Sequence, residues 1–69
     1  MIVLEGVIEA FNEERGDGLF RSDAGELLYF HCVCIADGSR AVPVDARARG
    51  LRSVGRLGRD EIIDVRLVA

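Results

Sequence analysis

Three short segments near the start of this 69-residue sequence decide its fold. They read GVIEAFN at residues 6–12, RGDGLF at 15–20 and LYFH at 28–31. β-Branched and aromatic residues make each segment typical of a strand, and glycine and acidic residues between them favour turns. Side chains alternate between the two faces of a strand, so Tyr29 and His31 share one face. The sequence therefore predicts three adjoining strands with one face in the core and one face free.

The remaining sequence predicts two more strands. The full set of expected strands is 2–12, 19–22, 27–32, 46–54 and 61–68. Gly6 inside the first strand indicates a bulge or bend, and Pro43 excludes a central strand at 41–44 because it lacks an amide N–H. No segment keeps a helical period over three turns. Five short strands with closely spaced turns predict one all-β domain over residues 1–69, a small barrel.

Composition excludes several classes of protein. Hydrophobic residues make up 49% of the chain, which predicts a folded core rather than disorder. The apolar runs are too short to span a membrane, and residues 1–5 lack the basic region of a signal peptide. We therefore expect a cytoplasmic protein with no membrane partner. No paired carboxylates, catalytic triad or phosphate loop can be placed, so neither enzyme activity nor a small-molecule substrate is expected.

The two cysteines, Cys32 and Cys34, are expected to be free and either buried or half-buried. On an extended segment their Cα atoms would lie about 7 Å apart, at the limit for a disulfide. Together with His31 they offer three metal ligands, whereas a structural zinc site needs four. The chain has no other cysteine or histidine. The sequence therefore predicts no metal and no cofactor.

Charge is distributed unevenly along the chain. Residues 1–34 carry seven acids and two arginines, a net charge of −5, while residues 35–69 carry five acids and seven arginines, a net charge of +2. Every basic residue is arginine. A GC-rich genome explains this usage, and it is also compatible with guanidinium groups that stack on bases and bind phosphates.

The three opening segments resemble the bacterial cold-shock domain, a five-stranded antiparallel OB-fold barrel that binds single-stranded nucleic acid. Residues 6–12 resemble the family's G-T-V-K-W-F-N, residues 15–20 its first ribonucleoprotein motif K-G-F-G-F-I, and residues 28–32 its second, V-F-V-H-F. Residues 23–25 fit the D-x-G turn between the two motifs. The resemblance covers nearly the whole chain and weakens after Arg40. It implies single-stranded RNA or DNA as the partner, and a role as an RNA chaperone or a regulator of transcription or translation.

The resemblance also implies which residues bind. The matching positions are Phe11, Asn12, Arg15, Tyr29 and His31. For Phe11, a place in the core and a place facing the ligand both remain open. Arg56 and Arg59 flank Gly58 and are candidates to clamp phosphates from a loop, with ordinary surface charge as the other interpretation.

Several positions depart from the family's pattern. Four aromatic positions are lost, at Ala10, Asp17, Leu19 and Cys32, and Glu9 reverses a positive charge. Each lost ring removes a base–aromatic stack, which contributes about 1–3 kcal/mol. We therefore expect the chain to bind single strands with modest affinity and little sequence preference. The acids also repel phosphates. They motivate an alternative from another class, a protein-interaction module on the same barrel, and we expect a monomer or weak dimer.

Overall fold

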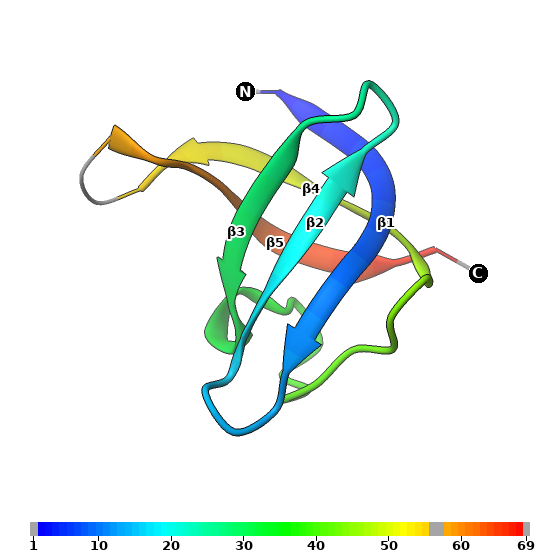
Figure 1. The fold of residues 1–69 in the computed structure, drawn as a ribbon, viewed down its shortest axis with the longest axis vertical. Coiled ribbons are helices and arrows are strands. Elements are labelled where there is room, and N and C mark those ends of the chain that lie inside the picture. The colour runs from blue at the N-terminus through cyan, green and yellow to red at the C-terminus, as the bar shows by residue number, and fades with distance from the viewer. Residues whose placement is uncertain (1, 56–57, 69) are drawn as a thin grey trace.

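In the computed structural model, which describes residues 2–55 and 58–68, five strands close into a barrel (Figure 1). The strands are β1 (Val3–Asn12), β2 (Asp17–Ser22), β3 (Leu27–His31), β4 (Arg47–Val54) and β5 (Asp60–Leu67). Their order around the barrel is β1-β2-β3-β5-β4. The predicted all-β, OB-like barrel of five strands is thus confirmed, and each strand begins and ends within two residues of its expected position. Within the described ranges, no helix is long and apolar enough to cross a membrane.

The barrel is mixed, which corrects the prediction of a purely antiparallel sheet. β1 is antiparallel to β2 and β4, and the β2–β3 and β4–β5 pairs are antiparallel as well. β3 meets β5 in parallel, through Tyr29 and Glu61. Successive antiparallel pairs give β3 and β5 the same direction as β1, so closing the barrel between them requires a parallel contact.

The core confirms the alternation predicted for the strands. The largest fully buried side chains are Phe20, Phe30, Ile8, Leu28, Ile62 and Val65. Leu28 and Phe30 point inward, while Tyr29 is half-buried and His31 is exposed. Residues 41–44 lie outside the strands, as Pro43 predicts, although Val42 is buried against the core.

β1 has a bulge at Glu9, whereas its pairing is regular at Gly6, where the sequence predicts a bulge or bend. The register against β2 shifts between Ile8 and Ala10, so Glu9 is the extra, bulged residue. A bulge resets the alternation of side chains. Ala10 is consequently exposed, while Phe11 is half-buried and packs against the core.

Gly6 lies where β1 and β2 approach each other closely. A Cβ at this position would overlap the carbonyl oxygen of Arg21 and lie 2.8 Å from the Cα of Ser22. Only a glycine lets β1 pass β2 at this separation.

The segment after β3 also differs from the prediction. Cys32–Cys34 form a short 3₁₀ turn, η1, rather than the end of a strand. The Cys32 N–H donates a hydrogen bond to the Gly16 carbonyl oxygen at 2.7 Å, and the Nδ1 atom of His31 accepts a hydrogen bond from the Val33 N–H at 3.3 Å. Both cysteines are free and half-buried, as expected.

Candidate nucleic-acid interface

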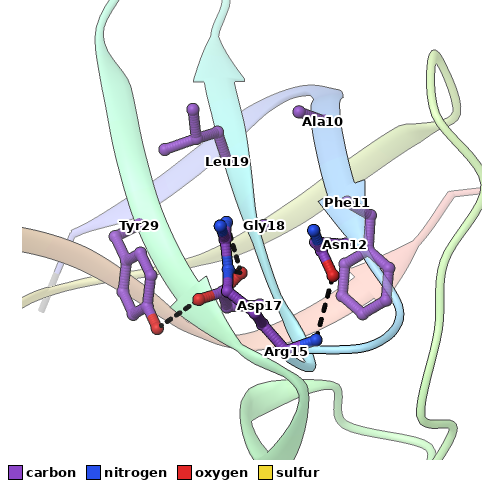
Figure 2. Close-up of a pocket in the computed structure, with 8 residues that line it drawn as sticks. All are labelled: Ala10, Phe11, Asn12, Arg15, Asp17, Gly18, Leu19 and Tyr29. Atoms are coloured by element: carbon purple, nitrogen blue, oxygen red, sulfur yellow. Dashed lines mark hydrogen bonds and ion pairs between the residues drawn. The ribbon is translucent and has the colours of Figure 1, made fainter.

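The outer face of β1, β2 and β3 carries an open depression of about 380 Å³ (Figure 2). The register of the strands aligns its lining residues in rows that cross the three strands. One row joins Ala10, Leu19 and Tyr29, and the next joins Phe11, Gly18 and Phe30. The first row is exposed or half-exposed. In the second row, Phe11 and Gly18 line the depression and Phe30 is fully buried.

Phe11 belongs to both the core and the depression, so the two interpretations of this residue are both correct. Its ring stacks on that of Phe30, with centroids 5.9 Å apart and the ring planes at 24°. Glycine at position 18 leaves room for this pair, since a Cβ there would lie 2.8 Å from the Phe11 ring and 2.9 Å from that of Phe30. Part of the Phe11 ring remains exposed at the edge of the depression (Figure 2).

The Asp17 carboxylate lines the depression, between the side chains of an arginine and a tyrosine. The Asp17 Oδ1 atom accepts a hydrogen bond from Arg15 Nε at 3.1 Å, and its Oδ2 atom accepts one from the Tyr29 hydroxyl at 3.1 Å (Figure 2). The Arg15 hydrogen bond is the main cause that holds the pKa of Asp17 below its ordinary value, with a smaller contribution from Tyr29. Asp17 is therefore ionised at neutral pH.

Tyr29 is fixed at both its hydroxyl and its ring. The guanidinium carbon of Arg59 lies 4.2 Å from the centre of the ring, a cation–π distance. Arg59 is itself 3.8 Å from Glu61 on β5. Burial, and then the hydrogen bond to Asp17, raise the pKa of Tyr29 above its ordinary value of 10.0.

Asn12 and His31 each bond to the backbone beside them. The Oδ1 atom of Asn12 accepts a hydrogen bond from the Arg15 N–H at 2.9 Å and so holds the β1–β2 turn. His31 caps η1, as described above. Its Cα is paired with that of Asp17, but the imidazole does not line the depression. Of the residues predicted from the sequence, the structure thus gathers Phe11, Asn12, Arg15 and Tyr29 at the depression, with Arg59 behind Tyr29.

The prediction for Arg56 falls outside the residues that the structure describes. Conversely, three residues first noted only as departures, Ala10, Asp17 and Leu19, line the depression. The signal for them was present in the sequence, because they occupy the positions where the cold-shock family has aromatic side chains.

Most arginines in the described ranges contact carboxylates of the same chain. Beyond the depression the pairs are Arg21–Glu9, Arg47–Glu5, Arg47–Asp23, Arg52–Glu26, Arg52–Asp60 and Arg66–Asp64. The charge of each guanidinium is then partly neutralised before any phosphate arrives. This pairing supports only modest electrostatic attraction for a polyanion.

The raised pKa of Tyr29 gives a direct test of the contact with Asp17. We predict that Tyr29 titrates above pH 10.0 and that Asp17→Asn lowers its midpoint, because the negative charge that opposes the tyrosinate is gone. Ultraviolet absorbance measures this cleanly, since the chain has one tyrosine and no tryptophan. Glu13→Gln, with the same loss of charge in the adjacent turn, is the control. Equal midpoints for the two variants would contradict the contact.

The site is thus defined by a half-exposed aromatic and apolar lining with one ionised carboxylate. Within residues 2–55 and 58–68, no three histidine, cysteine or acidic side chains gather as a metal site would require. A scan against protein-family models and a search of curated proteins found no match to the chain.

Proposed function

We propose that this chain is a cold-shock-like protein of the bacterial cytoplasm that binds single-stranded RNA or DNA in the depression on β1, β2 and β3. The observation that carries the proposal is the aligned row of Ala10, Leu19 and Tyr29 beside the Phe11–Phe30 pair. Together these side chains offer a base an apolar surface, with the Tyr29 ring at one end and the Phe11 ring at the other. The resemblance of the opening segments to the cold-shock domain supports the same ligand.

The fixed ring of Tyr29 favours stacking. Its hydroxyl is bonded to Asp17 and Arg59 lies against its ring, so little side-chain freedom is left to lose when a base binds. Single-stranded nucleic acid is recognised by stacking on such rings, with cations along the backbone path. Arg15 and Arg59 supply these cations, with 70% and 60% of their side chains exposed.

The charges also set the expected strength of binding. Arg15 and Arg59 must exchange Asp17 and Glu61 for phosphates, and exposed ion pairs of this kind contribute little to stability. Two phosphate contacts on a single strand give a slope of about −1.4 for log Kobs against log salt. We therefore expect a binding protein whose affinity for single strands is modest and depends only weakly on salt concentration.

Two matched variants test where the strand binds. Leu19 in the depression and Ile63 on β5 are 37% and 36% exposed. Leu19→Glu and Ile63→Glu make the same change of charge and polarity at similar exposure. We predict that Leu19→Glu weakens binding of a pyrimidine oligonucleotide about tenfold, the size of one lost base contact, and that Ile63→Glu changes it less than about twofold.

Tyr29 fluorescence at low salt reports the binding in both variants, because no other tyrosine or tryptophan contributes. A matching duplex serves as a further control, since its bases cannot reach the lining. Equal losses in the two variants would place the contact elsewhere, and an unchanged Tyr29 signal with the native chain would refute the proposal.

A protein contact is the second candidate function, and an apolar cluster on another wall of the barrel favours it. Val3, Leu51 and Ile63 lie side by side across β1, β4 and β5. Val3 is 56% exposed, so the cluster is open to a partner. Sedimentation velocity over a range of concentrations tests self-association through it. A native dimer that Ile63→Glu dissociates would support this function, and a monomer at every concentration would exclude self-association through the cluster.

A further inference from the structure

Among the described residues, Asp17 is the one acidic group that lines the depression, and it leaves an acceptor surface there. Its side chain is 15% exposed. Of about four acceptor positions on an ionised carboxylate, Arg15 bonds to Oδ1 and Tyr29 to Oδ2. Arg15 is 70% exposed, so it can move to a phosphate while Tyr29 continues to hold the carboxylate in place. A ligand in the depression then contacts the Asp17 carboxylate, which is held in place, accepts hydrogen bonds and has no proton to donate.

We propose that Asp17 is a specificity-determining residue that makes this depression select guanine. The inference rests on the proposed function, because it concerns which base of a single strand occupies the site. The Watson–Crick edge of guanine carries two adjacent donors, N1–H and the 2-amino group, which match the two oxygens of a carboxylate. Bases in single strands are open to recognition along this edge.

The other bases match the carboxylate less well. Cytosine and adenine each present one amino group beside an acceptor nitrogen, so only one hydrogen bond forms and a lone pair faces the acid. Uracil and thymine present one N–H between two carbonyl oxygens, both of which the carboxylate repels. The expected order of affinity is guanine first, cytosine and adenine next, and thymine or uracil last.

The surroundings of Asp17 suit a single base. The depression, at about 380 Å³, lies near the lower end of the range for small-ligand pockets. Tyr29 and Phe11 border it on β3 and β1, with Asp17 on β2 between them (Figure 2). A base that stacks on either ring therefore brings its edge toward the carboxylate. This selection of guanine departs from the little sequence preference that the sequence analysis predicts.

The experiment uses short thymidine oligonucleotides with one central substitution by guanosine, inosine, adenosine or cytidine. Inosine keeps N1–H and lacks the 2-amino group. For the native chain we predict that the guanosine oligonucleotide binds about tenfold more tightly than all-thymidine, the size of one good bidentate pair, with inosine intermediate. Asp17→Asn should reduce this ratio to less than about twofold.

Glu13→Gln is the matched control, because it removes one exposed carboxylate from the neighbouring turn without touching the depression. It should raise affinity for all the oligonucleotides alike and leave the guanosine ratio unchanged. Equal binding of guanosine, inosine and thymidine oligonucleotides by the native chain would overturn the inference and leave the proposed function standing. A guanosine preference that survives Asp17→Asn would overturn it as well. Binding of none of them would refute the proposed function itself.

Discussion

Gly6→Ala is expected to destabilise the protein strongly. The new methyl group would overlap the Arg21 carbonyl oxygen, a backbone atom that cannot move without separating β1 from β2. Gly6 is also paired with Ala48 on β4, so a shift of β1 disturbs both of its ladders. Overpacking against backbone is expected to cost about 3 kcal/mol or more, a large part of the roughly 3–10 kcal/mol that a chain of this size has.

Gly25→Ala is the matched control for this substitution. Gly25 lies in the β2–β3 turn with φ +93°, and a Cβ there would meet nothing within 4 Å. Gly25→Ala is therefore expected to lower the stability only by the strain of an alanine in the left-handed conformation, about 1–2 kcal/mol. Urea unfolding followed by circular dichroism compares the two variants. Similar urea midpoints for the two variants would show that β1 and β2 lie farther apart at Gly6 than they do in the structure.

Ala10→Trp is expected to increase affinity for single strands about tenfold or more. Ala10 is exposed in the first row of the depression, paired with Leu19. An indole at this position adds an aromatic surface next to Tyr29 and Phe11, and one base–aromatic stack contributes about 1–3 kcal/mol. The new tryptophan, the first in the chain, also serves as its own fluorescence probe.

Ala24→Trp provides the control, because Ala24 is also exposed but lies in the β2–β3 turn, at the other end of these strands from the β1–β2 turn (Figure 1). Its affinity should equal that of the native chain. An Ala10→Trp protein that folds but binds no better than Ala24→Trp would show that bases do not enter the depression.

The sequence predicts the strands because their signal is local. Alternation at 28–31 separates Leu28 and Phe30 from Tyr29 and His31 without reference to any other segment, and the structure agrees. The bulge is less predictable, since the two-against-one pairing at Glu9 depends on how β1 meets β2. That pairing, in turn, decides that Phe11 packs on Phe30.

The chemistry of the site depends still more on distant contacts. Asp17 and Tyr29 are twelve residues apart in the chain, and Arg59 contacts Tyr29 from the position just before β5. The sequence placed a carboxylate at position 17 but gave no sign that it would accept hydrogen bonds from Arg15 and Tyr29 together. His31 looked like a ligand-binding residue, yet its Nδ1 atom bonds to the backbone of η1, a turn that the sequence did not predict.

The central claim is that the face of β1, β2 and β3 binds single-stranded nucleic acid. The most direct measurement is an NMR titration of the ¹⁵N-labelled native chain with a short guanosine-containing single strand at low salt. We predict amide shifts centred on Ala10, Gly18, Leu19 and Tyr29, with Val3, Leu51 and Ile63 unchanged. Shifts centred on Val3, Leu51 and Ile63 instead, or no shifts at all, would contradict it.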